Sequence, residues 1–185
     1  MHFGHFDDQQ REYVISDART PLPWINYLGS EDFFALLSNT AGGYCFYRDA
    51  RLRRLTRYRY NICPTDQEGF RFYIKDGSAV WNPGWQPTKT ELDGYTCHHG
   101  LGYSVIEGRK NGILAAQTLL VPQGENCLLI RLTLKNEAGT EKTLDTFPYV
   151  EFCLWDAMDD GSNFQRNFSI GEVEIEPDAI YHKTE

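Results

Sequence analysis

Three acidic side chains follow a strongly apolar stretch in the second half of the chain. Asp156, Asp159 and Asp160 come directly after residues 143–155. Carboxylates are the acid and base of glycosidases, and clustered carboxylate oxygens can hold calcium. The spacing lacks the alternating ligands and final glutamate of a calcium loop, and acids so close in sequence rarely flank a glycosidic bond. We therefore interpret these residues as solvated acids of a turn.

Cys97, His98 and His99 are residue types that bind metals, and they are consecutive. Neighbouring residues on a strand point to opposite faces, and no third and fourth ligand is evident, so we predict no metal site. The chain also has no phosphate-binding P-loop, no H-E-x-x-H and no G-x-S-x-G. The sequence thus predicts neither a bound cofactor nor a self-contained catalytic site.

Trp81 and Trp85 lie in a segment punctuated by proline and glycine, which is typical of a loop. Exposed loop tryptophans can stack on the apolar faces of sugar rings, whereas buried ones anchor a loop to a sandwich. The sequence leaves both interpretations open. Trp24, beside Pro23, is predicted to be an anchor in the core or between domains.

Residues 47–60 combine six arginines with three tyrosines. Strand alternation would place Arg57 and Arg59 on one face and Tyr58 and Tyr60 on the other. Such a surface could bind phosphates and stack bases. We favour a structural role, in which the arginines pair with acids across an interface or brace a neighbouring domain.

Length and charge limit the function further. The 185 residues, 41% of them hydrophobic, suffice for one sandwich or barrel, so 1–185 is treated as one domain. A formal net charge of -8 repels phosphate, and neither nucleic acid nor membrane is predicted as a partner. The start of the chain has no basic stretch followed by an apolar run, which indicates no secretory signal or spanning helix. We expect a cytoplasmic protein.

The cysteines are widely spaced and form no C-x-x-C, which argues against a disulfide framework and a zinc knuckle. We predict that most are reduced and buried. They are Cys45, Cys63, Cys97, Cys127 and Cys153.

Short segments rich in aromatic and β-branched residues alternate with turn residues, and this pattern predicts an all-β chain that folds as an antiparallel β-sandwich. The predicted strands are 13–15, 43–47, 55–62, 70–74, 102–106, 113–121, 127–135 and 143–155, with hairpin loops at 108–112 and 136–139. Ser30 followed by Glu31 and Asp32 predicts one short helix over Glu31–Leu37. Residues 180–185 resemble the start of a strand without a partner after it, which suggests a fragment of a longer protein.

Long stretches of the chain resemble cellobiose phosphorylases in order and spacing. The matching segments are 4–8, 11–15, 23–29, 38–44, the arginine-rich run, 99–103, 150–155, 163–167, 171–174 and 180–185. Some positions differ from that family's pattern: Cys45, His98 and residues 147–149. Among these, Pro148 removes a backbone donor and predicts an edge position or a bulge.

The resemblance implies the inverting glycoside phosphorylases of glycoside hydrolase family ninety-four. Their fold begins with an N-terminal super-sandwich, which implies that 1–185 is the incomplete first domain and that the (α/α)6 catalytic barrel lies outside this chain. In that family inorganic phosphate attacks the anomeric carbon of cellobiose while a barrel aspartic acid protonates the glycosidic oxygen. Glucose 1-phosphate and glucose are released. The fragment alone is predicted to be inactive.

The resemblance also implies a role for the sandwich in a homodimer and in a loop near the leaving glucose. That loop matches 163–167, where Arg166 is implied as a substrate contact and Gln165 as a second one. Without the resemblance, Arg166 would be a turn arginine paired with Asp159 or Asp160. The alternatives are a chitobiose or cellodextrin phosphorylase, or a non-catalytic carbohydrate-binding sandwich that uses Trp81 and Trp85.

Overall fold

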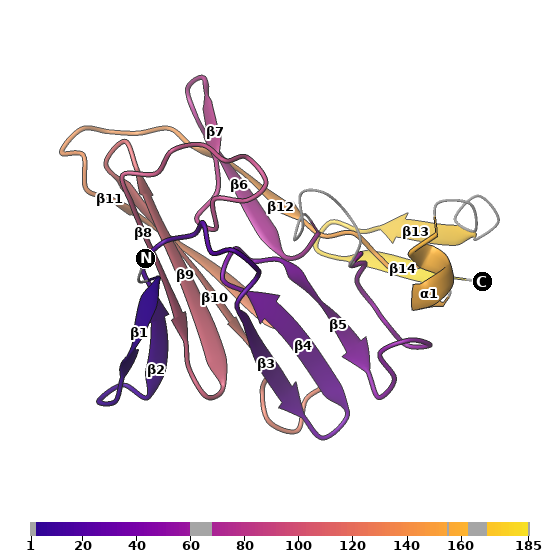
Figure 1. Ribbon diagram of the computed structural model, residues 1–185. Helices are drawn as coiled ribbons and strands as arrows, with labels where there is room; N and C mark the ends of the chain where they lie inside the picture. Colours follow the sequence, from indigo (N-terminus) through magenta and orange to yellow (C-terminus); the bar gives the residue numbers. More distant parts are fainter. Residues whose placement is uncertain (1–2, 60–67, 155, 163–169, 185) are drawn as a thin grey trace.

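The chain is built almost entirely of antiparallel strands, as the sequence predicts (Figure 1). The computed structural model describes residues 3–59, 68–154, 156–162 and 170–184. Within them the single α-helix is α1 (Ala157–Asp160).

The largest sheet contains six strands in the order β1-β2-β8-β9-β10-β11. Their bounds are β1 (Gly4–Asp7), β2 (Glu12–Ile15), β8 (Gly94–His99), β9 (Tyr103–Lys110), β10 (Ile113–Leu120) and β11 (Leu129–Asn136). The turn between β9 and β10 is Asn111–Gly112, whose φ angles of 51° and 75° match a two-residue hairpin turn. The predicted hairpin at 108–112 is therefore confirmed, with a shorter loop.

A second sheet packs on the first and contains β3 (Ile25–Ser30), β4 (Phe33–Ser38) and β5 (Gly43–Tyr47). The predicted helix over Glu31–Leu37 is wrong, because residues 33–38 form β4 and pair with both neighbours. Phe33, Ala35 and Leu37 point inward and are buried, which is the period of two of a strand. An apolar run this short fits both the period of a helix and the period of a strand, and cross-strand pairing decides between the two structures.

The main core lies between these two sheets. Its buried side chains come from both and include Ile15, Leu28, Leu37, Ile106 and Leu119. Fully burying an aliphatic side chain of this size contributes roughly 1.5–3 kcal/mol. Beside this core, Asn26 of β3 donates to the carbonyls of Gly100 and Tyr103 and so fixes β3 against the turn between β8 and β9.

A third sheet has the order β12-β6-β7, with β6 (Arg71–Asp76), β7 (Ala79–Trp81) and β12 (Asp145–Tyr149). The predicted hairpin at 136–139 is wrong, because β11 pairs with β10 whereas β12 crosses to pair with β6. Pro148 lies in β12 at the edge of this sheet, as predicted for a residue without a backbone donor.

Of two other predicted strands, the one at the end of the chain is confirmed and the one at 55–62 is not. Residues 180–184 form β14 (Ile180–Thr184), whose partner β13 (Gly171–Ile175) precedes it. In the predicted strand 55–62, the described residues make one isolated bridge, from Thr56 to Phe152. Arg57 donates its backbone N–H to the Glu151 carbonyl, so this segment runs between elements instead of joining a sheet.

Candidate functional site

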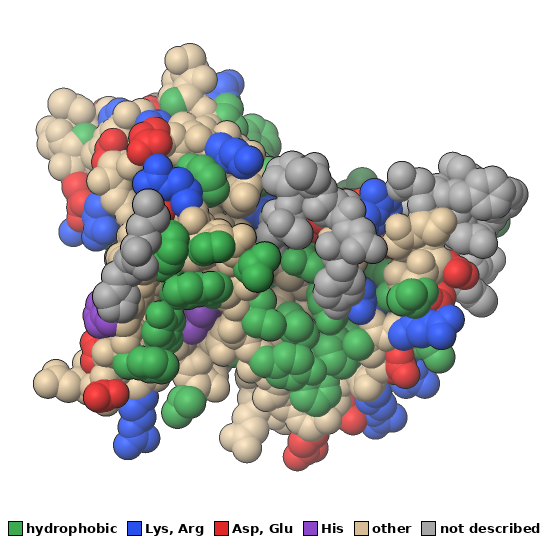
Figure 2. Space-filling view, viewed as in Figure 1, with side chains coloured by type: hydrophobic (Ala, Val, Ile, Leu, Met, Phe, Trp, Pro, Cys, Tyr) green, Lys and Arg blue, Asp and Glu red, His purple; other side chains and the backbone are tan. Residues whose placement is uncertain are grey.

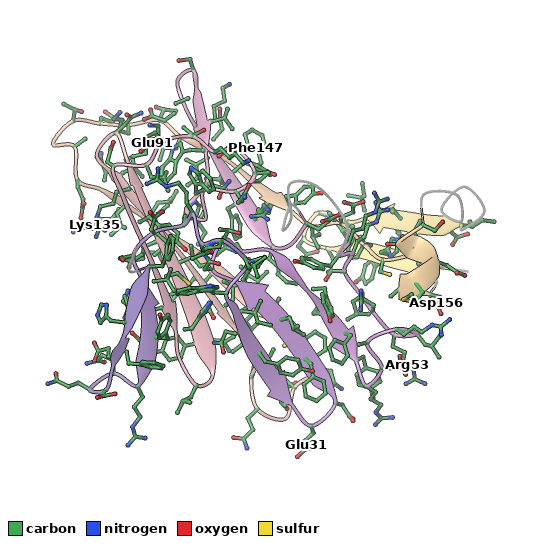
Figure 3. All side chains as sticks on the ribbon, viewed as in Figure 1. Glu31, Arg53, Glu91, Lys135, Phe147 and Asp156 are labelled. Carbon is green, nitrogen blue, oxygen red and sulfur yellow. The ribbon has the colours of Figure 1, made fainter. Side chains whose placement is uncertain are left out.

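The best-defined polar site joins the arginine-rich segment to the residues around α1. Thr56 and Phe152 form an antiparallel bridge, and the Cys153 N–H donates to the Leu55 carbonyl at 3.0 Å. These contacts bring two segments about a hundred residues apart in sequence into register. Figure 3 shows Asp156 beside α1 and Arg53 on the segment after β5, at the same end of the molecule.

Arg57 lies at the centre of this site. We call Arg57, Glu151 and Asp160 the Arg57 cluster. Nη1 of Arg57 donates to Glu151 Oε1 at 2.6 Å, Nη2 donates to the Asp160 carbonyl at 3.1 Å, and Nε lies 2.9 Å from Asp160 Oδ2. The Arg57 and Asp160 side chains are 6% and 2% exposed, so both charges have left water. A guanidinium with several fixed partners tolerates such burial better than an ammonium.

A second arginine holds the start of α1. Arg51 Nε donates to Asp156 Oδ2 at 2.7 Å, and the Arg51 carbonyl accepts from the Ala157 N–H at 2.9 Å. Asp156 Oδ1 caps the helix by accepting from the N–H groups of Met158 and Asp159. Helix α1 is thus tied at both ends to residues 51–57.

These contacts correct the interpretation of the acids as solvated. Asp156 and Asp160 are buried. Burial would raise the pKa of Asp156, but the backbone hydrogen bond from Met158 and the Arg51 guanidinium outweigh it and lower the pKa. Burial raises the pKa of Asp160, and Arg57 offsets only part of that rise. Asp156 and Asp160 thus serve ion pairs and a helix cap, which is a structural role, whereas Asp159 is partly exposed.

The remaining arginines of the run mostly stack on tyrosines. Arg54 lies 4.0 Å from the centre of the Tyr44 ring, and Arg48 and Arg53 lie 4.9 and 5.8 Å from that of Tyr47. Arg48 also forms a bidentate pair with Asp32. These contacts agree with the predicted structural role of the run. Tyr60 lies outside the described residues.

The two tryptophans of the 81–87 segment have different environments. Trp81 is the last residue of β7 and is fully buried against Ile74, Ile113 and Ala115, so it cannot stack on a sugar. Trp85 is partly exposed, and the Lys89 ammonium lies 5.9 Å from the centre of its ring. The anchor interpretation therefore holds for Trp81. Trp24 packs against the main core, which agrees with its predicted role as an anchor.

Cysteines and histidines take scaffold positions. Cys45, Cys97 and Cys153 are buried, as predicted, whereas Cys127 is partly exposed and Cys63 lies outside the described residues. Burial raises the pKa of the Cys45 thiol to about 11 and that of Cys153 to about 12, so both are protonated at neutral pH.

Each histidine of the 97–99 segment has its own hydrogen bonds. His98 Nδ1 lies 2.7 Å from Glu12 Oε2. His99 Nε2 donates to the Trp24 carbonyl at 3.1 Å, so its Nδ1 accepts from the Ser104 hydroxyl. Burial lowers the pKa of His99 and favours this neutral form. Both ring nitrogens of His99 are therefore engaged within the protein.

The predicted substrate contacts Gln165 and Arg166 lie outside the described residues. The described chain reaches Ser162, whose N–H donates to the Asp159 carbonyl at 2.9 Å just after α1. The predicted pairing of Arg166 with Asp159 or Asp160 therefore stays untested. The Arg57 cluster was not evident as a unit in the sequence, because Arg57 lies about a hundred residues from Glu151 and Asp160.

A protein-family model described as the supersandwich domain of glycosyl hydrolase 94 matches residues 11–185. The chain belongs to this family. The observed antiparallel strands are those expected of a supersandwich domain. No helix among the described residues is long and apolar enough to cross a membrane.

Curated relatives of this supersandwich chain include several phosphorylases. It is 38% identical to the N,N'-diacetylchitobiose phosphorylase of Vibrio furnissii over 169 residues, which cover 89% of the chain and 21% of that protein. It is 36% identical to the protein of the same name from Vibrio proteolyticus, with 97% of the chain and 23% of that protein covered. A solabiose phosphorylase of Paenibacillus borealis is 32% identical over 82% of the chain and 20% of that protein. The chain thus spans about a fifth of the length of these relatives.

Proposed function

We propose that this chain is the N-terminal supersandwich portion of a cytoplasmic disaccharide phosphorylase, with cellobiose as its substrate. The family match over residues 11–185, together with relatives named as phosphorylases, is the observation that supports this function. The ordered resemblance to cellobiose phosphorylases along most of the chain supports the choice of substrate. The proposed products are glucose 1-phosphate and glucose.

Phosphorolysis of a disaccharide needs few catalytic groups from the protein. Phosphate is already a nucleophile, so the reaction requires an acid for the leaving oxygen and no general base. We assign that acid and the phosphate contacts to the barrel outside this chain. The chain itself supplies no catalytic residue and needs no cofactor, because inorganic phosphate is a co-substrate.

The role proposed for the sandwich is to hold the leaving glucose with Arg166 and, more weakly, with Gln165. A guanidinium offers several fixed donors to sugar hydroxyls. The preceding helix α1 has an anchorage that suits this role. Arg51 and Arg57 fix its two ends, and the Arg57–Asp160 pair is buried. A fixed base limits the range of positions open to the segment that follows, which favours precise orientation of a substrate.

A second candidate substrate is N,N'-diacetylchitobiose. It is favoured by the two Vibrio relatives, which are named for this activity and are 38% and 36% identical. The two substrates differ by acetamido groups. We would assay the complete polypeptide with phosphate and each disaccharide and compare kcat/KM. A higher kcat/KM for cellobiose supports the proposal. A higher kcat/KM for N,N'-diacetylchitobiose would mean that the proposed substrate is wrong and that the proposed phosphorolysis is right.

We also propose that the complete protein is a homodimer and that residues 1–185 alone are inactive. Light scattering on the complete protein tests the first point, with a monomer contradicting it. Purified 1–185 incubated with cellobiose and phosphate tests the second. Release of glucose 1-phosphate that persists after removal of any full-length enzyme would contradict it.

A further inference from the structure

An open groove runs between the β1–β2 hairpin and β3, well away from the Arg57 cluster. Its volume is about 860 Å³, within the range of ligand sites. Figure 2 shows hydrophobic side chains along both walls of this hollow. We call it the aromatic groove, and the residues used below are Phe6, Asp8, Arg11, Tyr13, Trp24, Asn26 and Tyr27.

Aromatic rings line the aromatic groove and remain open to solvent. Phe6 packs edge-on to Tyr13 at 4.8 Å, and Tyr13 lies 5.7 Å from Trp24, which gives one wall a continuous row of rings. Tyr27 belongs to the opposite wall. Phe6 is 78% exposed and Tyr27 is 54% exposed. Rings that keep so much surface in water can still cover the apolar face of a ligand.

The floor of the aromatic groove is held in place by hydrogen bonds. Asn26 Nδ2 donates to the carbonyls of Gly100 and Tyr103 at 2.9 and 3.0 Å. Glu12 accepts from His98 and from the Tyr103 hydroxyl. These contacts hold the Asn26 and Glu12 side chains in place, so the shape of the floor is formed before a ligand binds. A preformed site loses less conformational entropy when a ligand binds.

The polar groups left over favour an uncharged ligand. Among the described residues, the side chains of Asp8 and Arg11 make no hydrogen bond or ion pair, and Asn26 Oδ1 accepts none. Asp7 and Glu12 also line the groove, but their carboxylates already accept hydrogen bonds from Gln9 and Gln10 and from His98 and Tyr103. The two charged side chains that remain, Asp8 and Arg11, are of opposite sign, so together they select neither an anion nor a cation. A carboxylate and an amide oxygen accept from hydroxyls, and a guanidinium donates to them. Aromatic faces beside mixed donors and acceptors suit the alternating apolar and hydroxyl-bearing surfaces of a sugar chain.

From these contacts we infer that the aromatic groove binds a neutral oligosaccharide, as a site separate from the one proposed at Arg166. The groove is open and has a volume of about 860 Å³, so it takes a chain of sugars rather than one enclosed ring. Binding places the sugar rings against Phe6 and Tyr27, with Asp8, Arg11 and Asn26 as hydrogen-bonding partners. This inference does not depend on phosphorolysis.

Isothermal titration calorimetry on the complete protein tests the aromatic groove, with cellopentaose, N-acetylchitopentaose and maltopentaose as neutral probes. We expect at least one probe to bind with a Kd of about 1 mM or lower. Phe6→Ala and Tyr27→Ala should each weaken that binding by about tenfold or more. Phe147→Ala and Tyr181→Ala are matched controls, because these side chains are 53% and 50% exposed outside the groove and should leave binding unchanged.

Several results would overturn the inference. One is the absence of a heat of binding with every neutral probe. Another is probe binding that is unchanged in Phe6→Ala, because such binding would belong to the active site and not to the aromatic groove. A third is preferential binding of a pentameric oligogalacturonide or chitosan. A change of oligomeric state in Phe6→Ala would show that protein covers the groove. Disaccharide phosphorolysis, measured on the same variants, should stay normal. A failure of the inference about the aromatic groove can therefore be told apart from a failure of the proposed function.

Discussion

Arg57 Nε lies 2.9 Å from Asp160 Oδ2, and both side chains are buried. The same guanidinium reaches Glu151 Oε1 at 2.6 Å and the Asp160 carbonyl at 3.1 Å. Removing two charges from water costs several kcal/mol per ion, and only good geometry with further hydrogen bonds offsets this cost. Nη1 and Nη2 of Arg57 supply such hydrogen bonds, so the link between the arginine-rich run and α1 depends on all three residues.

Removing Arg57 should therefore destabilise the protein strongly. Arg57→Met leaves Asp160 buried without its charged partner, and we expect the free energy of unfolding to fall by about 3–5 kcal/mol. Urea unfolding followed by fluorescence measures this change. Arg48→Met is the control: its pair with Asp32 is exposed to solvent, and the unfolding midpoint should barely move.

The double variant separates charge from packing in the Arg57 cluster. Arg57→Met combined with Asp160→Leu removes both charges, so it should recover part of the stability lost in Arg57→Met alone. Equal stability of Arg57→Met and the parent protein would show that the pair has no structural role. A double variant less stable than the single one would contradict the electrostatic explanation.

Trp81 and Trp85 should respond differently to truncation. Trp81 is fully buried, so Trp81→Ala creates a cavity, and we expect a loss of about 3–5 kcal/mol in the free energy of unfolding. Trp85 is partly exposed, and Trp85→Ala should cost less. Urea unfolding of both variants measures the difference. A larger loss of unfolding free energy from Trp85→Ala than from Trp81→Ala would contradict the assignment of Trp81 as the buried anchor.

Glu12 should give the protein an acid-sensitive contribution to stability. Burial alone would raise its pKa, but hydrogen bonds from Tyr103 and His98 outweigh burial and the nearby Asp7, and the pKa is lowered from 4.5. The carboxylate therefore stabilises the fold above about pH 4.5, and this contribution is lost as the pH falls through the lowered pKa.

Melting temperatures from about pH 3 to 7 test this contribution. The gap between the parent protein and Glu12→Gln should be widest near neutral pH and should narrow in acid. Glu125→Gln serves as the control, since Glu125 is exposed on a loop and should leave the pH profile unchanged. A gap that stays constant with pH would show that Glu12 acts through packing only.

The all-β fold was predictable because alternation and turn residues are local signals. Gly43–Tyr47 and Pro148 at an edge were found in this way. The helix predicted over Glu31–Leu37 failed because a short apolar run fits both periods, and only pairing with β3 and β5 decides it. The choice of strand partner is also non-local. The sequence therefore did not indicate that β12 pairs with β6 instead of β11, or that β14 pairs with the preceding strand β13.

The site was less predictable than the fold for the same reason. Arg57 and Asp160 are residue types of a solvated surface, and no local pattern indicates that they meet in a buried pair. The sequence did indicate that the arginine-rich run pairs with acids. The aromatic groove also went unnoticed, because Phe6, Trp24 and Tyr27 reach it from two different sheets and an intervening loop.

Arg166 should act on the sugar acceptor and not on phosphate. If Arg166 makes the proposed contact in the complete enzyme, Arg166→Ala should remove charge-assisted hydrogen bonds worth about 1.5–3 kcal/mol, which is roughly a ten- to hundredfold loss of kcat/KM. In the synthetic direction the KM for glucose should rise, whereas in phosphorolysis the KM for phosphate should change little. Arg131→Ala, at an exposed position of β11, is the control. Normal glucose kinetics in a well-folded Arg166→Ala enzyme would remove Arg166 from the substrate site.

The most direct test of the proposed function is phosphate-dependent cleavage by the complete polypeptide. Phosphorus NMR would follow a mixture of the enzyme, inorganic phosphate and either cellobiose or N,N'-diacetylchitobiose. We predict that the phosphate signal is converted to an α-linked sugar 1-phosphate, and that omitting phosphate stops release of the free sugar. Cleavage that proceeds equally well without phosphate, or no cleavage of either disaccharide, would contradict the assignment of this chain to a disaccharide phosphorylase.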